Sequence, residues 1–253
     1  MPAAILARLV LLDARRGGLP WLALAGLALA LLLAGFLSQV ALTEARSLQL
    51  AVVAALLRAV AVFLVAVQVS ASVVREMNDK GLELMLSLPL GRSSQYLGRL
   101  AGFALLAAAL AVVFAAPLLV WATPGAVALW AVSLALEGAL VAAAALFFAL
   151  TLAQPVAAIA TTAGLYLLAR SMAAIQAIAA GPLVEPSLAN QAARLCVDGV
   201  ALLLPRLDAV TRSEWLIYGA PDASGFMSAM GALAIYIALL AAAGLFDFYR
   251  RSD

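Results

Sequence analysis

One polar segment interrupts the apolar sequence of this chain and reads Arg75-Glu76-Met77-Asn78-Asp79-Lys80-Gly81-Leu82-Glu83-Leu84-Met85-Leu86-Ser87-Leu88-Pro89-Leu90-Gly91-Arg92. Long hydrophobic runs lie on both sides of it. An ionised side chain in the hydrocarbon of a bilayer costs roughly 2.5–3.5 kcal/mol or more. The segment must therefore emerge on one side of a membrane, between two helices that cross it. We call residues 75–92 the polar segment.

The polar segment has the spacing of an amphipathic helix. Its polar stripe consists of Glu76, Asp79, Lys80, Glu83 and Ser87, and its apolar face includes Leu82, Leu84, Met85, Leu86 and Leu88. Pro89 and Gly91 would end such a helix. We therefore expect a short amphipathic helix in residues 75–93 that lies across the ends of two membrane helices, a shape suited to receiving force from a partner. The alternative is a solvated turn with a surface helix.

The composition is that of an integral membrane protein. Of the 253 residues, 67% are hydrophobic and 11% are charged, whereas soluble domains carry about 25% charged residues. Nearly all of the length is needed for membrane spans, so we expect a single all-α transmembrane domain over residues 1–253. A net charge of +2 gives no reason to expect a nucleic-acid partner.

Six apolar runs are long enough to cross a bilayer as helices. The predicted spans are residues 19–42, 50–73, 99–121, 126–152, 156–180 and 226–246. The breaker Thr123-Pro124-Gly125 separates the third span from the fourth, and the tight turn Gln154-Pro155 separates the fourth from the fifth. These two turns divide an apolar run whose only internal charge is Glu137.

Two further segments are amphipathic without being long or apolar enough to span. Residues 1–18 carry apolar side chains on one helical face and arginines away from it, which predicts an interfacial helix leading into the membrane. The alternative is a plain polar tail. Residues 181–225 contain two short helical patterns, about 187–204 and 207–218, punctuated by prolines. We expect them to form an outer helical segment that rests on the membrane surface between spans five and six.

Loop charges predict the orientation of the chain. Six spans place both termini, the polar segment and the Gln154 turn on one side of the membrane. That side carries nine basic residues: Arg8, Arg15, Arg16, Arg75, Lys80, Arg92, Arg99, Arg250 and Arg251. The other side carries four: Arg46, Arg194, Arg206 and Arg212. The positive-inside rule therefore predicts that both termini and the polar segment are cytoplasmic.

Three charged residues fall inside predicted spans, namely Arg58, Glu137 and Arg170. Counted from the span ends, all three lie at a similar depth in the outer half of the membrane. Opposite charges at matched depth favour pairing, because an unpaired charge in hydrocarbon is costly. We expect Glu137 to pair with Arg170 or Arg58 and to help line a pathway or gate. The alternatives are a pair that only fixes helix packing, and an Arg58 side chain that reaches the outer interface.

The polar segment also resembles a known family. From Glu76 to Arg92 it reads E-x-x-D-K-G-L-E-L-x-L-S-L-P-L-x-R, followed by Tyr96 and Gly98. This pattern is similar to the segment after the second span in type-2 ABC exporter permeases. The pieces Asp79-Lys80-Gly81 and Leu86-Ser87-Leu88-Pro89 look most like permeases of the group associated with copper-enzyme maturation. The resemblance covers about a tenth of the chain, and the stretch around Pro205 to Gly219 is less specifically similar to the family's outer segment.

The resemblance implies a permease subunit with a coupling helix that docks on a cytoplasmic ATPase subunit. The docking residues that it implies here are Glu76, Asp79, Lys80, Glu83, Leu84, Leu88 and Arg92. A second permease copy, or a related permease chain, would complete the pathway in the cytoplasmic membrane of a prokaryote. ATP and Mg²⁺ would be bound by the ATPase partner, so this chain would be a transport subunit and would hold no cofactor of its own.

The chemistry of an enzyme is missing from the sequence. It has no G-x-x-x-x-G-K-[ST] loop for hydrolysing ATP, no histidine and a single cysteine, Cys196, so no catalytic residue or metal site is expected. Two other classes stay open. One is an ATP-independent secondary transporter or channel, which would need a longer path of ionisable groups and typically shows half-repeats. The other is a membrane scaffold that recruits a cytoplasmic partner through the polar segment.

Overall fold

The structure is a computed structural model that describes residues 2–40, 45–79, 91–181, 188–211, 215–216 and 223–250. In these residues every regular element is helical. The elements are α1 (Pro2–Arg16), α2 (Leu19–Val40), α3 (Ala45–Asn78), α5 (Arg92–Ala115), η1 (Ala116–Val120), α6 (Pro124–Leu152), α7 (Pro155–Ala179), α8 (Leu188–Leu203), η2 (Leu207–Ala209) and α10 (Ala223–Arg250). The 3-10 turns η1 and η2 are short connections.

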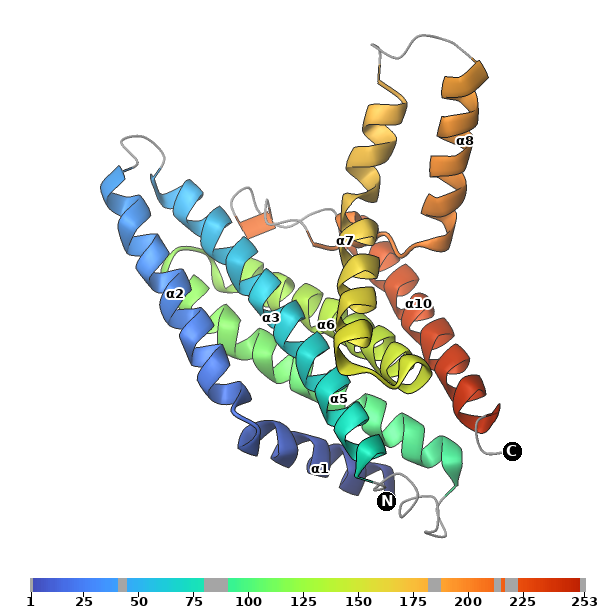
Figure 1. The fold of residues 1–253 in the computed structure, drawn as a ribbon. Coiled ribbons are helices and arrows are strands. Elements are labelled where there is room, and N and C mark those ends of the chain that lie inside the picture. The colour runs from blue at the N-terminus through green and yellow to red at the C-terminus, as the bar shows by residue number, and fades with distance from the viewer. Residues whose placement is uncertain are drawn as a thin grey trace.

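Six of these helices are long and apolar enough to cross a membrane: α2, α3, α5 together with η1, α6, α7 and α10. The predicted number of spans is therefore confirmed, and the chain has the architecture of a multi-pass membrane protein. Their order alternates direction along the bundle (Figure 1). As a result, several parts of the chain lie together at one end of the bundle, which we call the terminal end. They are α1, the end of α3, the start of α5, the turn between α6 and α7, and the end of α10.

Helices α3 and α6 form the centre of the bundle, and α2, α7 and α10 lie at its edge. Four consecutive alanines of α6 are buried: Ala142, Ala143, Ala144 and Ala145. Their small side chains let the neighbouring helices approach α6 closely. At Gly138, an added Cβ would lie 2.7 Å from the Cβ of Ala107 on α5. The α5–α6 pair is consequently the most extensive helix contact in the described chain.

Helix α1 packs across α5 at the terminal end, as Figure 1 shows. Leu6, Ala7 and Ala14 are buried there, whereas Ile5 and Leu9 are exposed. The chain then turns into α2 through Gly18, whose φ of +83° is a conformation that L residues with side chains rarely adopt. An amphipathic helix before the first span was predicted, and α1 has that form.

Two span helices are longer than the sequence suggests. α3 continues to Asn78, past the predicted end at residue 73, and α5 begins at Arg92 rather than near Arg99. Charged side chains can stay on these helices because they find partners there. Arg75 contacts Asp13 of α1, and Arg99 contacts Glu76. The first residues of the predicted amphipathic helix are therefore the last turn of α3, and residues 80–90 lie outside the described residues.

The outer helical segment is described over residues 188–211 and 215–216. α8 is present close to its predicted bounds, but it lies beside the C-terminal half of α7, and the two extend beyond the other helices at the end opposite the terminal end (Figure 1). A hydrogen bond of 2.9 Å from Gln176 to Asp198 joins them. Of the helix expected over residues 207–218, the structure describes the 3-10 turn η2, non-helical backbone at residues 210–211, and helical residues 215–216. Residues 212–214 and 217–218 lie outside the described residues.

Candidate functional site

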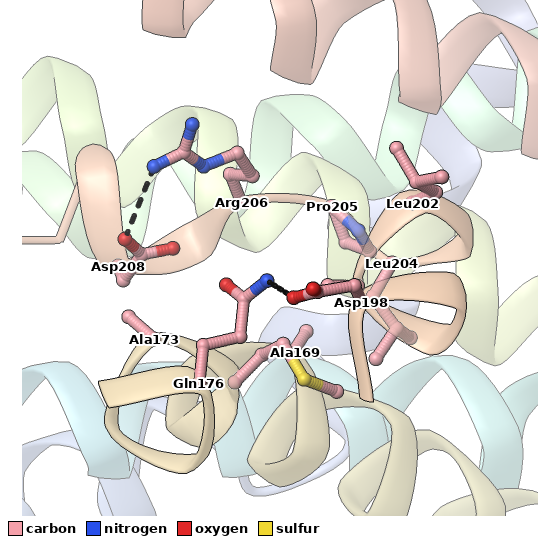
Figure 2. A pocket seen from close by; sticks show the side chains of 11 residues that line it. Ala169, Ala173, Gln176, Asp198, Leu202, Leu204, Pro205, Arg206 and Asp208 are labelled. Atoms are coloured by element: carbon pink, nitrogen blue, oxygen red, sulfur yellow. Dashed lines mark hydrogen bonds and ion pairs between the residues drawn. The ribbon is translucent and has the colours of Figure 1, made fainter. Parts of the chain in front are cut away.

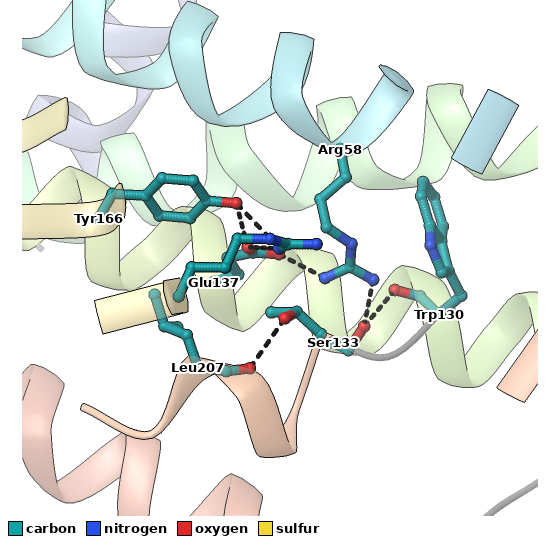
Figure 3. Close-up of polar contacts among 8 residues, drawn as sticks. Arg58, Trp130, Ser133, Glu137, Tyr166 and Leu207 are labelled. Carbon is teal, nitrogen blue, oxygen red and sulfur yellow. Dashed lines mark hydrogen bonds and ion pairs between the residues drawn. The ribbon is translucent and has the colours of Figure 1, made fainter. Parts of the chain in front are cut away.

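A buried network of charged and polar side chains joins α3, α6 and α7 (Figure 3). Arg58 of α3 donates through Nη1 to Oε2 of Glu137 on α6. The other carboxylate oxygen, Oε1, accepts from the hydroxyl of Tyr166 at 2.8 Å and from Nη1 of Arg170 at 3.3 Å, both on α7. The same Arg170 nitrogen lies 3.1 Å from the Tyr166 oxygen. The structure therefore brings together the three intramembrane charges, and adds Tyr166 to them.

The two arginines differ in their surroundings. The Arg58 side chain is 1% exposed and that of Glu137 is fully buried, whereas the Arg170 side chain is 33% exposed. Removing one partner of a fully buried ion pair leaves a charge without compensation, which is much more costly than losing a pair at the surface. The Arg58–Glu137 pair is thus a structural requirement of the bundle centre, while Arg170 stands at its rim.

Two further α6 residues surround Arg58. The Trp130 ring lies 5.2 Å from the guanidinium carbon, a cation–π contact. Ser133 accepts from Arg58 Nη2 at 3.0 Å and itself donates to the Trp130 carbonyl at 2.8 Å. The buried Arg58 Nε and Trp130 Nε1 have no hydrogen-bond partner in the described part of the chain. The network therefore holds more donors than acceptors.

Sequence reasoning missed Tyr166, Ser133 and Trp130 in this network. Ser133 and Glu137 are four residues apart on α6, and Tyr166 and Arg170 are four apart on α7, which places each pair on one helix face. That spacing was an available signal. The i, i+4 spacing does not say which neighbouring helix each face contacts, because the polar residues of one helix do not identify the helix packed against it.

At the terminal end a second polar group lies where α1, α3 and α5 meet. Glu76 accepts from Arg99 Nη2 at 2.7 Å, and Arg99 is 7% exposed. Asp13 of α1 accepts from Ser72 at 3.2 Å and from Gln68 at 3.3 Å on α3. These contacts tie the three helix ends to one another, and sequence reasoning had not assigned a role to Asp13, Gln68 or Ser72.

A groove of about 680 Å³ runs along the same end between α1 and the end of α3. Both apolar and charged side chains line it, and α1 contributes some of each. They include Leu6, Leu9, Asp13, Glu76, Asp79 and Arg99. An amphipathic element of another protein would meet both kinds of side chain in this groove.

Three of the seven residues that the resemblance implies for ATPase docking are described by the structure, and they lie at the two ends of the polar segment. Glu76 is in the last turn of α3, Asp79 follows Asn78 and is exposed, and Arg92 is the first residue of α5. The Arg92 guanidinium lies 6.0 Å from the ring of Tyr249 on α10. The other four, Lys80, Glu83, Leu84 and Leu88, lie outside the described residues.

A second cavity of about 390 Å³ opens between α7, α8 and η2 (Figure 2). Ala169, Met172 and Leu204 contribute apolar walls, and Asp198 and Asp208 contribute carboxylates. Asp198 accepts from Gln176 and lies 4.0 Å from Arg194, while Asp208 lies 3.9 Å from Arg206. In the described residues no group of three or more histidine, cysteine, aspartate or glutamate side chains could hold a metal ion.

No protein-family model matches the chain, and no curated protein sequence matches it. The functional proposal therefore rests on the residues of this chain and on the resemblance of its polar segment.

Proposed function

We propose that this chain is the membrane-spanning permease subunit of an ATP-binding-cassette exporter. A separate cytoplasmic ATPase subunit docks on the polar segment and supplies the energy, and a second permease chain completes the pathway. ATP and Mg²⁺ are bound by the ATPase, and this chain provides the path through the cytoplasmic membrane of a prokaryote. The observation that carries the proposal is the exporter-like polar segment between two continuous helices.

The geometry of α3 supports a mechanical role for that segment. α3 is one unbroken helix whose last turn carries Glu76 and whose middle carries Arg58. The portion from residue 58 to 78 is about 30 Å long at 1.5 Å per residue. A displacement applied at the polar segment would therefore be carried as a rigid body to the buried network of Arg58, Glu137 and Arg170, which is the kind of movement that alternating access requires.

The contacts at the terminal end support the same role. The Glu76–Arg99 pair joins the end of α3 to the start of α5, so both helices that flank the polar segment would move together. Asp13 joins α1 to α3 in the same way. Force received by the polar segment would thus reach three helices instead of bending one.

The proposed orientation places the terminal end in the cytoplasm, where the ATPase would be. Its support is the nine-to-four distribution of basic residues between the two ends, together with the common position of both termini (Figure 1). Fusing a cytoplasm-active fluorescent protein to the C-terminus, and separately a periplasm-active phosphatase, tests it. Fluorescence without phosphatase activity is expected, and the opposite pattern would exclude cytoplasmic docking.

Purification of the tagged chain from its native membrane in mild detergent tests the partner. We expect a stoichiometric soluble subunit that contains a phosphate-binding loop. Charge reversal by Glu83→Lys with Arg92→Glu should release that subunit, while Arg194→Glu, an exposed charge change on α8, should retain it. A chain that comes without any ATPase after gentle crosslinking would favour an ATP-independent transporter or a scaffold instead.

A further inference from the structure

The buried network between α3, α6 and α7 carries one positive charge more than it neutralises. Arginine keeps its proton at every relevant pH, so Arg58 and Arg170 contribute two formal charges. Among the described residues, Glu137 is the only acidic side chain that contacts either arginine, and it contributes one negative charge. An uncompensated charge at this depth of a membrane is costly. The network is therefore arranged for one additional anion.

The donors and acceptors of the network show the same imbalance. Glu137 is already occupied at both oxygens, by Arg58, Arg170 and Tyr166. Arg170 makes its contacts through Nη1, and its Nη2 and Nε have no partner in the part of the chain that the structure describes. Two nitrogens of a guanidinium in fixed geometry can bind a carboxylate or a phosphate with two parallel hydrogen bonds.

Exposed apolar surface of α7 lies close to Arg170. Arg170 is the rim residue of the network, with a third of its side chain exposed. One turn before it on α7, Leu167 is 62% exposed. The distance along α7 from Pro155 to Arg170 is about 22 Å, within a hydrocarbon core of about 30 Å. A free inorganic ion would be poorly soluble there, whereas an amphiphile would bring its charged group with its chain in lipid.

We propose that Arg170 binds the anionic head group of an amphiphile, a carboxylate or phosphate on a hydrocarbon chain, that reaches it from the lipid-facing side of α7. Glu137 and Tyr166 position the Arg170 side chain by holding Nη1, which leaves Nη2 and Nε for the ligand. In the proposed exporter, this chemistry identifies anionic amphiphiles as the class of cargo. The binding site itself does not depend on the ATPase partner, so the proposed site and the proposed exporter function can be refuted independently of each other.

Spin-label spectroscopy of the full chain in phosphatidylcholine vesicles tests the site. The probe is stearate carrying a spin label near the end of its chain, at a pH where its carboxylate is ionised, and phosphatidylcholine with the same label is the reference. We expect stearate to associate with the wild-type protein roughly five-fold more strongly, as about 1 kcal/mol per contact of a basic residue with an anionic lipid predicts. Equal association of the two labelled lipids would overturn the proposal.

Variants locate the effect. Arg170→Gln should bring the preference for stearate close to one, and Arg170→Lys should retain part of it because the charge stays. Arg194→Gln removes an exposed arginine of α8 and should leave the preference unchanged. A preference that survives in Arg170→Gln would show that stearate binds elsewhere. If soluble acetate or inorganic phosphate displaces the labelled stearate at constant ionic strength, the site binds a free anion and the assignment of an amphiphile is overturned.

A measurement on the wild-type chain keeps the proposal testable should Arg170→Gln fail to fold. Stearate bearing a photoreactive group should label peptides of α7 around residues 163–174. Exclusive labelling of α2 or α10, the other exposed span helices, would contradict the assignment. An acidic side chain of a second copy of this chain could occupy Arg170 in place of the amphiphile. The wild-type protein would then show no preference for stearate over phosphatidylcholine, which would overturn the proposal.

Discussion

Arg58 and Glu137, separated by 78 intervening residues, form an ion pair in which neither side chain has more than 1% of its surface exposed. The pair joins α3 to α6, the two helices at the centre of the bundle. A second arginine, Arg170, reaches the same carboxylate from α7 at 3.3 Å. One glutamate therefore connects three helices, and most of the consequences of the fold for stability and transport can be tested there.

Replacing Glu137 should strongly destabilise the protein. Glu137→Gln keeps the shape of the side chain but leaves Arg58 buried without an opposite charge, which costs about 3–5 kcal/mol. Thermal or denaturant unfolding of the purified protein in detergent measures this loss. Asp198→Asn, where the carboxylate is half exposed and its arginine lies 4.0 Å away, should change stability by at most about 1 kcal/mol. Equal losses in the two variants would argue against a special role for the buried pair.

The two arginines that contact Glu137 should contribute unequally. In a double-mutant cycle, the coupling of Arg58 with Glu137 should exceed that of Arg170 with Glu137, because the Arg170 side chain is 33% exposed and shares the carboxylate oxygen Oε1 with the Tyr166 hydroxyl. Arg58→Gln and Arg170→Gln, each alone and with Glu137→Gln, give the required unfolding free energies. A larger coupling at Arg170 would mean that the inner pair is not the dominant one.

Adding a methyl group at Gly102 should loosen α1. Its Cβ would lie 2.9 Å from the backbone of Ala7 and 2.9 Å from the side chain of Val10, so α1 must shift or part from α5. We expect Gly102→Ala to cost about 1–3 kcal/mol and to speed proteolysis of the N-terminal helix. The matched control is Gly164→Ala on α7, where the added methyl meets nothing within 4 Å. Slow cleavage in both variants would contradict tight packing of α1.

The turn between α6 and α7 offers a stabilising substitution. Ala153 ends α6 with φ of 51°, a left-handed conformation that costs residues with a Cβ roughly 1–2 kcal/mol relative to glycine. Ala153→Gly should therefore raise the melting temperature. The same change at Ala160, an exposed position inside α7, should lower stability by about 0.5–1 kcal/mol. Two effects of the same sign would be incompatible with the left-handed turn.

Exchanging charges across the terminal end should restore what the single changes remove. Glu76→Arg alone places two positive charges together, and Arg99→Glu alone places two negative ones together, at a contact of 2.7 Å. Each should cost about 1.5–3 kcal/mol, the range for a hydrogen bond to a charged group. The double exchange should recover at least half of the loss, measured by unfolding in detergent. Simple addition of the two losses would show that Glu76 and Arg99 act independently.

Much of the architecture follows from the order of the residues. The six runs that could span a membrane were countable because charges and proline-containing turns delimit them, and Gln154-Pro155 marked the short connection between α6 and α7. Span ends were less predictable. Arg75, Glu76 and Arg99 suggested that the helices stop before them, yet contacts with other helices let these charges remain on α3 and α5.

The candidate site was only partly predictable. Matched depth pointed to Glu137 with Arg58 or Arg170, and both arginines contact it. The hydroxyl of Tyr166 and the ring of Trp130 were not expected, because an aromatic residue in an apolar helix resembles ordinary core packing. The helix that α8 contacts was not predictable either, because α8 meets α7 through Asp198 and its half-buried neighbours, while Leu195 and Leu202 of its apolar face are exposed.

The sequence by itself determined that the chain is helical and spans a membrane, and that its charges lie in a few defined places. Hydrophobicity and turn chemistry act locally along the chain, so they can be read residue by residue. Only the tertiary structure decided that Arg58, Glu137, Tyr166 and Arg170 share one network, and that Arg170 keeps two nitrogens without a partner among the described residues. Such contacts depend on how helices rotate and pack against one another, which no single stretch of sequence specifies.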